Sequence, residues 1–326
     1  LATNHPTAFL ETLLYPTYGK RPAYNLLRGD MFSKPFTRWL CRQVKTIPIF
    51  RFRDGFENMR KNQEIMDEIT ARLHKKQVIS IMVEGSHAHV KRLRRVQKGA
   101  ARIAFQTYEK YGDIDLEIVP LGVNFTDSDQ FRSILMSEFG EPIFLKDFID
   151  IYKENDRRAI KLLTKEIEQR LRKYVVHIED EADEPFTNVL LEMNRHEQQL
   201  RRLPIFDRSN HLLYQEIAIA NQINELDETE KSYLRKDVEG YQKRLHRLGL
   251  QDIGVAQPQA YRLGTSLLLA LGFLPFLLGY GLNFLPLWYA KYFADKNIKK
   301  IEFHSSIRFG VGLGGYGGGG GGGGDV

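Results

Sequence analysis

The chain is poor in cysteine: among its 326 residues it has only Cys41, so no disulfide can form within it. This excludes the small secreted proteins that disulfides hold together, and a reducing compartment is the simplest setting. The sequence also lacks the spacing of metal ligands, because His87 and His89 lie near Glu84 without a convincing third or fourth partner. We therefore predict no metal ion and no other cofactor.

A strong net charge is also missing. The formal charge of +6 indicates only a weak preference for anionic surfaces, either a membrane or a nucleic acid. A basic run at residues 91–98 would suit a nucleic acid, but it has no recognisable binding motif and no aromatic residues between its cations. We therefore expect a membrane, and no nucleic acid, among the partners.

The first half of the chain contains alternating strand and helix signals. Three segments have the patterns of strands, namely residues 47–53 (IPIFRFR), 78–83 (VISIMV) and 118–124 (IVPLGVN). Helical spacing lies between them, from residue 56 to residue 75 and from residue 99 to residue 111. This order predicts an α/β domain, which we place at residues 1–180.

The composition changes after this domain. Residues 181–255 are rich in Glu, Gln, Lys, Arg and Leu and have no strand signal, so we predict a helical extension. Helix starts are expected at Asn210 and at Asp227, because such side chains are favoured at helix N-termini. A solvated helical appendage is the simplest interpretation, and a regulatory role is the alternative.

One long stretch has no charge at all. Residues 263–290 are 28 residues without a charged side chain, which is enough to span a bilayer. They contain Pro275 and Pro286 in two similar halves around the segment GYGLN, and basic residues flank both ends. We predict a membrane-associated helical hairpin over residues 256–308 that enters and leaves on the cytoplasmic face. A single straight span and a soluble core helix are the alternatives.

Both ends of the chain have unusual sequences. The first residue is Leu1 and not Met, and residues 314–324 are glycine broken only by Tyr316. We expect a fragment of a longer protein. We also expect residues 309–326 to be a disordered, artefactual tail, because a glycine run cannot bury a core.

Candidate chemistry comes from four short segments. In the first, NHPTAFLE, His5 is followed at short range by Glu11, and such a pair can act as a base and the carboxylate that orients it. In the second, IPIFRFRDG, Arg51 and Arg53 share one face of a strand, where a guanidinium can hold a phosphate by two hydrogen bonds. Taken alone, the first segment is better explained by an ordinary exposed His, and the second is equally compatible with a solvated strand face.

The other two segments place polar groups at strand ends. In VEGSHAHVKRLRRVQKGAARIAF, the strand ends at Glu84, Gly85 lets a ligand approach the backbone, and Lys98 with the amides after it can face an anion. In IVPLGVNF, Pro120 interrupts a buried-looking strand, which indicates a bulge or a sheet edge beside a site.

In this order the four segments resemble the four blocks of the glycerolipid (PlsC-like) acyltransferase family, closely over residues 1–125. The resemblance implies a glycerol-3-phosphate acyltransferase-like fold, with a mixed sheet flanked by helices. It implies that His5 is the catalytic base and that Glu11 orients it. The C-terminal part looks like the extension of a bacterial branch, which places the expected protein on the cytoplasmic face of the inner membrane.

The resemblance also implies substrate-binding residues, namely Arg51 for the acceptor's phosphate, Glu84, Gly85 and Ser86 for the shape of the acceptor site, and Pro120 near the acyl donor. Two features depart from the family pattern. Five residues separate His5 from the acid, where most members have four, and the acid is Glu11 where the family has Asp. Val83 stands where the third block usually has proline.

The implied function is transfer of a fatty acyl group from acyl-CoA or acyl carrier protein (acyl-ACP) to 1-acylglycerol-3-phosphate, in phospholipid synthesis. The sequence leaves two alternatives open. One is glycerol 3-phosphate as the acceptor, since both acceptor classes share the four blocks. The other is a catalytically inactive membrane scaffold of the same fold, supported only by the altered spacing around Glu11.

Overall fold

The computed structural model describes residues 1–7, 22–33, 35–50, 56–112, 114–130, 133–198, 209–257, 263–298 and 304–317. The chain divides into two compact units. Unit 1 comprises Leu1–Thr126 and Ile134–His177, and unit 2 comprises Asp127–Ser133 and Ile178–Val326. Unit 1 ends three residues before residue 180, where the composition predicts the boundary.

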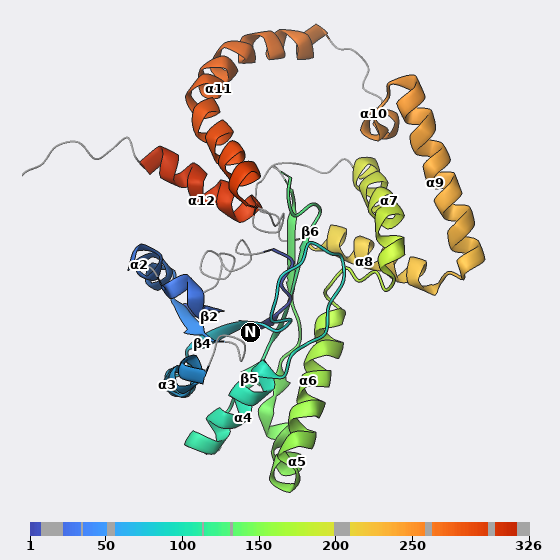
Figure 1. Ribbon diagram of the computed structural model, residues 1–326. Helices are drawn as coiled ribbons and strands as arrows, with labels where there is room; N and C mark the ends of the chain where they lie inside the picture. Colours follow the sequence, from blue (N-terminus) through green and yellow to red (C-terminus); the bar gives the residue numbers. More distant parts are fainter. Residues whose placement is uncertain are drawn as a thin grey trace, which may run out of the picture. The chain divides into compact units, whose positions relative to one another are not determined.

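Unit 1 is built on a six-stranded sheet in the order β3-β2-β4-β1-β6-β7 (Figure 1). Its strands are β1 (Ala2–Thr3), β2 (Ala23–Arg28), β3 (Thr46–Ile49), β4 (Val78–Met82), β6 (Pro120–Phe125) and β7 (Leu135–Phe139). Neighbouring strands run parallel except β7, which is antiparallel to β6. A second, two-stranded sheet pairs β5 (Glu117–Ile118) with β8 (Ile143–Phe144). The predicted α/β fold with a mixed sheet is therefore confirmed.

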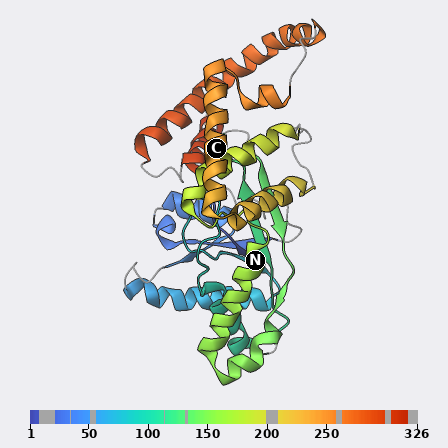
Figure 2. The same ribbon diagram turned by 90° about the vertical axis from the view of Figure 1, so that its right-hand side faces the viewer.

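Helices cover both faces of this sheet. They are η2 (Gly29–Phe32), α2 (Pro35–Gln43), α3 (Phe56–His74), α4 (Gly99–Tyr111), η4 (Leu145–Phe148), α5 (Ile149–Glu154) and α6 (Asp156–Arg172). Figures 1 and 2 show α2 and α3 on opposite sides of the strands β2 and β4. Connections between parallel strands are almost always right-handed. The chain moves one way along the sheet from β2 to β3 and the opposite way from β3 to β4, so the helices of these two connections lie on opposite faces.

Two apolar clusters hold the helices to the sheet. In one, Phe105 of α4 and Leu163 of α6 pack with Ala2 of β1, all fully or almost fully buried. In the other, Ile69 of α3 packs with Ile79 of β4 and with other buried side chains of β2, β3 and α4. Burial of this kind contributes about 1.5–3 kcal/mol for each large side chain, so the clusters fix β1 and β4 side by side.

Strand β1 lies where the path of the chain reverses. From β1 the chain builds β2 and β3 and returns through β4 on one side of it, and then builds β6 and β7 on the other side. In open α/β sheets, ligands bind outside the carboxyl ends of the strands at such a point. Strands β1 and β4 end at Thr3 and Met82, so His5 and Glu84 follow directly at this edge.

The predicted strand at residues 118–124 is interrupted. Strand β5 ends at Ile118 and β6 begins at Pro120. The expectation of a sheet edge at Pro120 is wrong, because β6 lies inside the sheet between β1 and β7, and the alternative of a bulge stays a prediction. Proline is tolerated there as the first residue of a strand, where its missing N–H leaves no ladder bond broken.

The described part of unit 2 is helical after residue 180. Its elements are η5 (Glu181–Asp183), α7 (Glu184–Glu197), α8 (His211–Glu225), α9 (Glu228–Leu248), α10 (Asp252–Ala256), α11 (Leu263–Asn297) and α12 (His304–Gly317). Phe186, Ile223 and Val238 join α7, α8 and α9 in one apolar cluster. Helix α9 begins with a capping box between Asp227 and Glu230, so the start predicted there is confirmed.

The apolar stretch forms one continuous helix, and the turn predicted at GYGLN does not occur. Helix α11 contains both Pro275 and Pro286. Each proline removes one backbone donor and bends a helix, and Figure 1 draws α11 as an arc. Asn283 adds a side-chain hydrogen bond to the carbonyl of Gly279, at 2.6 Å. An apolar segment with few outside partners gains most by keeping its internal backbone bonds, which explains why the helix continues.

Helix α12 packs against α11, so the chain reverses its direction after α11 and not within it. Helix α12 includes residues 309–317, which the composition predicted to be disordered. Glycine is disfavoured in a helix by only about 1 kcal/mol per residue, and its small size permits close helix packing. Residues 318–326 of the predicted tail lie outside the described residues.

Candidate active site

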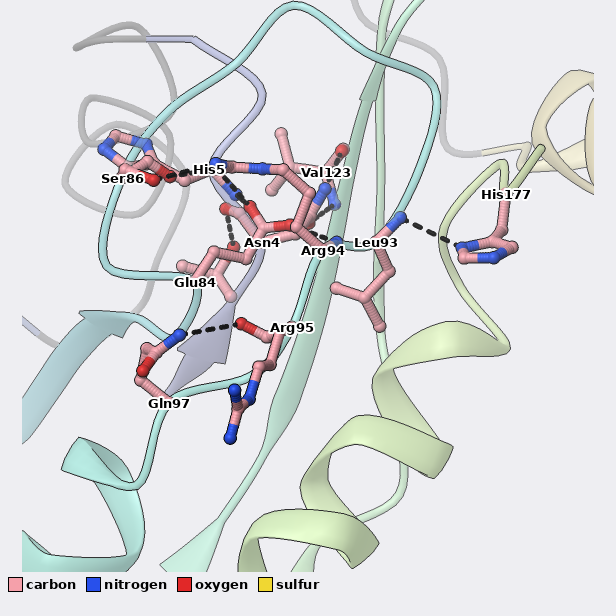
Figure 3. Close-up of polar contacts among 11 residues, drawn as sticks. Asn4, His5, Glu84, Ser86, Leu93, Arg94, Arg95, Gln97, Val123 and His177 are labelled. Atoms are coloured by element: carbon pink, nitrogen blue, oxygen red, sulfur yellow. Dashed lines mark hydrogen bonds and ion pairs between the residues drawn. The ribbon is translucent and has the colours of Figure 1, made fainter. Parts of the chain in front are cut away.

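Asn4 ties the carboxyl end of β1 to β6. Its amide nitrogen donates to the carbonyl of Val123 and its amide oxygen accepts from the N–H of Val123, both at 2.8 Å (Figure 3). Only 4% of Asn4 is exposed, so these bonds are protected from water. Strand β4 holds the other side of β1, where the N–H of Val83 donates to the carbonyl of Thr3 at 2.9 Å. The backbone that carries His5 is thus fixed from both sides.

Glu84 binds the backbone of His5 directly. One carboxylate oxygen of Glu84 accepts from the N–H of His5 at 2.7 Å, and the other accepts from the N–H of Arg94, also at 2.7 Å. The guanidinium of Arg94 forms an ion pair with the same carboxylate at 3.2 Å. The Glu84 side chain is only 3% exposed. Through these contacts Glu84 connects the end of β1 to the segment between β4 and α4.

The segment after Glu84 turns back on itself. Gly85 has a φ of 71°, in the left-handed region that favours glycine, and its N–H donates to the carbonyl of Met82 at 3.1 Å. Arg94 closes the turn, since its guanidinium donates to the hydroxyl of Ser86 at 2.8 Å and also to the Ser86 carbonyl. The turn places Ser86 on the same side as His5 (Figure 3).

His87 lies beside His5. The ring centroids are 5.3 Å apart and the rings meet edge to face. The N–H of Ala88 donates to the carbonyl of His5 at 3.3 Å, so the backbone around His87 is also tied to β1. His5 is therefore held at both its N–H and its carbonyl, with a second imidazole next to its ring.

The start of α4 lies close to the same edge. The N–H of Gln97 donates to the carbonyl of Val83 at 2.7 Å, which brings the segment before α4 to the end of β4. Lys98 is the exposed residue before Gly99, the first residue of α4. A helix N-terminus carries partial positive charge and N–H groups without helical partners, so this position suits an anion.

The structure brings four of the predicted site residues together, namely His5, Glu84, Gly85 and Ser86. Pro120 lies elsewhere: it is buried and pairs with Ala2 at the start of β1, whereas Val123 pairs with Asn4 next to His5. Glu11 and Arg51 lie outside the described residues.

Sequence reasoning missed Arg94 and the placement of His87. Arg94 is one of several cations in residues 91–98, and nothing in that run distinguishes it from its exposed neighbour Arg95. His87 was considered only as a metal ligand. Its distance of three residues from Glu84 was the one available signal, since Glu84 itself was expected at the site.

The arrangement has the elements of a hydroxyl-activating site. An imidazole can take a proton from a hydroxyl near neutral pH, and a fixed backbone holds such a base in place. Lys98 and the start of α4 supply positive charge nearby. Ser86 and His87 add polar groups on the same side of the edge.

Comparisons with known proteins relate this chain to acyltransferases. A family model described as Acyltransferase matches residues 3–124, which include the end of β1, β2 to β4, α4 and most of β6. Glycerol-3-phosphate O-acyltransferase 2 of Saccharomyces cerevisiae is 25% identical over 241 residues, covering 72% of this chain and 31% of the relative. Glycerol-3-phosphate O-acyltransferase 1 of the same yeast is 32% identical over 105 residues, covering 31% of this chain and 14% of the relative.

An uncharacterised acyltransferase of Schizosaccharomyces pombe is 28% identical over 95 residues, covering 29% of this chain and 14% of the relative. The chain thus spans less than a third of the length of these curated relatives. All three are yeast proteins, and the bacterial branch expected from the C-terminal part stays a prediction. The matched segment contains the edge at which His5 and Glu84 meet. Residues 3–124 of the chain are thus similar to the acyltransferase family.

Proposed function

We propose that unit 1 transfers a fatty acyl group from a thioester to a hydroxyl of a glycerol phosphate, with His5 as the general base. The observation that carries this proposal is the anchoring of His5. Its N–H donates to Glu84 and its carbonyl accepts from Ala88, at the carboxyl end of β1 where the sheet reverses its order. These bonds fix the backbone from which the imidazole ring extends, and a fixed position of the base relative to bound substrates favours catalysis.

The proposed reaction has one direct step. A ring nitrogen of His5 takes the proton of the acceptor hydroxyl while the hydroxyl oxygen attacks the thioester carbonyl carbon. The carbon–sulfur bond breaks, and the leaving thiolate takes the proton back from the imidazolium. General base catalysis of this type contributes on the order of 10²–10⁴-fold. Neither Ser86 nor Cys41 is needed as an acyl carrier, and Cys41 is buried within α2.

Positive charge at the edge supports a phosphate-bearing acceptor. Lys98 and the N-terminus of α4 lie beside the end of β4. Arg51, which the family resemblance assigns to the phosphate, comes two positions after the last residue of β3 in the sequence. Glu11 is the proposed partner that orients the His5 ring. Both residues remain proposals, because they lie outside the described part of the chain.

Two acceptors fit this chemistry. The names of the two Saccharomyces relatives favour glycerol 3-phosphate. The resemblance of the sequence blocks led to 1-acylglycerol-3-phosphate, which carries the same phosphate and one acyl chain. The donor is acyl-CoA or acyl carrier protein, both of which present the acyl group as a thioester.

Helix α11 supports a membrane location. Among the described helices it alone is long and apolar enough to cross a bilayer, and none of its most apolar window is buried. An enzyme whose donor and product carry acyl chains benefits from working at a membrane surface, since the chains need not pass through water. We propose that the catalytic unit faces the cytoplasm, in line with the single cysteine.

The test is acceptor-dependent release of free thiol from palmitoyl-CoA by the full chain in phospholipid vesicles. Glycerol 3-phosphate and 1-acylglycerol-3-phosphate are supplied in parallel, and palmitoyl-ACP replaces the CoA thioester in a second series. Release that requires one acceptor supports the proposal and identifies that acceptor. The absence of acceptor-dependent release with either donor would reject the enzyme and favour the inactive scaffold.

A further inference from the structure

Residues 84–94 form a loop that one arginine closes. Glu84 begins the loop at the end of β4, and Arg94 ends it. Arg94 contacts Glu84 twice, through its N–H at 2.7 Å and its guanidinium at 3.2 Å, and it contacts Ser86 through the same guanidinium at 2.8 Å. Figure 3 shows the three side chains turned toward one another beside His5.

The far side of this loop has its own anchors. The amine of Lys91 donates to the carbonyl of Phe125 at 2.7 Å, and the N–H of Leu93 donates to a ring nitrogen of buried His177 at 3.0 Å. These contacts hold residues 91–93 against the rest of unit 1 without using Arg94. The near side is held by the N–H of Ala88, which donates to the carbonyl of His5, and by the guanidinium, which binds the hydroxyl and the carbonyl of Ser86.

The Arg94 side chain is well placed for this task. It is 26% exposed, so the ion pair with Glu84 is partly shielded from water. The planar guanidinium can donate to two acceptors at once in fixed directions, whereas a lysine ammonium at the end of a flexible stem cannot reproduce that fork. Ser86 accepts from Arg94, and a hydroxyl that accepts one hydrogen bond still has its own hydrogen to donate.

We propose that Arg94 is a positioning residue for the acceptor: it closes the loop so that Ser86 and His87 face the substrate that His5 deprotonates. This inference rests on the proposed acyl transfer. Arg94 itself need not contact the acceptor. Its loss leaves Glu84 bound to the N–H of His5, so the base keeps its place while the loop opens.

The kinetic test compares Arg94→Ala with Arg95→Ala in the full chain, with the acceptor identified by the activity assay. Arg95 is the exposed neighbour just after the loop, so both variants lose one positive charge at adjacent positions. Arg94→Ala is expected to raise the KM for the acceptor about 10-fold or more with a much smaller change in kcat, as loss of a charge-assisted bond predicts. Arg94→Lys should recover only part of the loss. An equal rise in the KM of Arg95→Ala would overturn the proposal, because the loss of one positive charge would then explain the whole effect.

A double-mutant cycle tests the route through Ser86. If Arg94 acts by placing that hydroxyl, Ser86→Ala added to Arg94→Ala should raise the KM little further. Effects that multiply independently would contradict this route. A fall in kcat with no change in KM would show that Arg94 positions His5 and not the acceptor. That result would also overturn the proposal.

Amide hydrogen exchange of residues 85–89 separates this proposal from the catalytic one. Arg94→Ala should speed exchange there and leave residues 91–93 near the wild-type rate, while Arg95→Ala changes neither. Unchanged exchange in Arg94→Ala would overturn the loop closure whether or not the chain is active. Faster exchange in a chain whose wild type transfers no acyl group would instead reject the proposed function and, with it, the role of the loop in acceptor binding.

Discussion

Glu84 in unit 1 and Asp183 in unit 2 are both buried carboxylates, and they are satisfied in different ways. Glu84 in unit 1, 3% exposed, accepts from the backbone N–H groups of His5 and Arg94. Asp183 in unit 2, fully buried, instead pairs with the side chains of Lys231, at 2.8 Å, and Arg235. A carboxylate that accepts from backbone N–H groups fixes the path of the chain. A carboxylate that pairs with charged side chains instead connects two secondary-structure elements.

The difference matches what each unit has to do. Glu84 holds the segment that carries a proposed base, where a displacement of about 1 Å can cost 10²-fold in rate. Asp183 lies at the start of α7 and ties it to α9, which carries both of its cations. Its loss should therefore affect stability, and the loss of Glu84 should affect activity. Four predictions test this comparison, from the largest expected effect to the smallest.

The first prediction concerns Glu84→Gln. The amide nitrogen of glutamine cannot accept a hydrogen bond, so one backbone N–H, of His5 or of Arg94, loses its partner and His5 shifts. We expect kcat/KM for acyl transfer to fall about 100-fold. The exposed Glu117→Gln serves as the control in the same unit. A rate near that of the wild type would show that Glu84 does not position His5.

The second prediction concerns Asp183→Ala. Removing this carboxylate leaves Lys231 buried without its main partner, and breaking a buried pair in this way costs on the order of 3 kcal/mol of unfolding free energy. Urea unfolding followed by circular dichroism measures the loss. Glu228 reaches the same lysine from the surface, 74% exposed, so Glu228→Gln should change stability little. Equal effects from the two variants would contradict the role given to Asp183.

The third prediction is the acid response of unit 2. Burial alone would raise the pKa of Asp183, but the hydrogen bonds from Lys231 and Arg235 outweigh it, and its pKa lies below the usual value of 3.8. A carboxyl whose pKa is lower in the folded state stabilises it fully above the unfolded value, and this contribution disappears as the pH falls through the folded pKa. The stability gap between wild type and Asp183→Asn should therefore narrow below about pH 4. A constant gap would contradict the charged state of Asp183.

The fourth prediction concerns Tyr241, whose hydroxyl donates to Asp252 at 2.6 Å while the other oxygen of Asp252 binds His196. The hydrogen bond to Asp252 is the largest cause that raises the pKa of Tyr241, to about 12. Tyr241→Phe should cost about 1 kcal/mol near pH 7. Because the folded state holds this proton more tightly, the contribution is complete below the unfolded pKa of about 10 and is lost as the pH rises toward 12.

Thermal unfolding of wild type and Tyr241→Phe between pH 7 and pH 11 measures this last effect. The two proteins should converge at the alkaline end. A difference that stays constant over the range would show that the bond to Asp252 is not what raises the pKa.

Local patterns predicted the elements of unit 1 well, because each pattern reflects burial on one face of a sheet or a helix. The helix predicted at residues 99–111 is α4, and the strand predicted at 78–83 is β4 with one residue fewer. The prediction at GYGLN was wrong for a physical reason. Prolines and glycines favour a turn in water, but in an apolar segment the internal hydrogen bonds of a continuous helix outweigh that preference.

Four of the expected site residues lie close together, but the contacts between them could not be predicted from the sequence. The family blocks brought His5, Glu84, Gly85 and Ser86 together, although 79 positions separate His5 from Glu84. No local pattern shows that the Glu84 carboxylate accepts from backbone N–H groups, because that depends on how β1, β4 and the loop pack. Arg94 was missed for the same reason, as its contacts with Glu84 and Ser86 span ten and eight positions, respectively.

The most direct test of the account replaces His5 itself. Acceptor-dependent thiol release is measured for the wild type and for His5→Ala at equal amounts of folded protein, checked by circular dichroism. The account predicts a fall of about 10²–10⁴-fold in His5→Ala, the usual contribution of a general base. Release in His5→Ala within a few-fold of the wild type would contradict His5 as the base, and with it the assignment of this edge of the sheet as the active site.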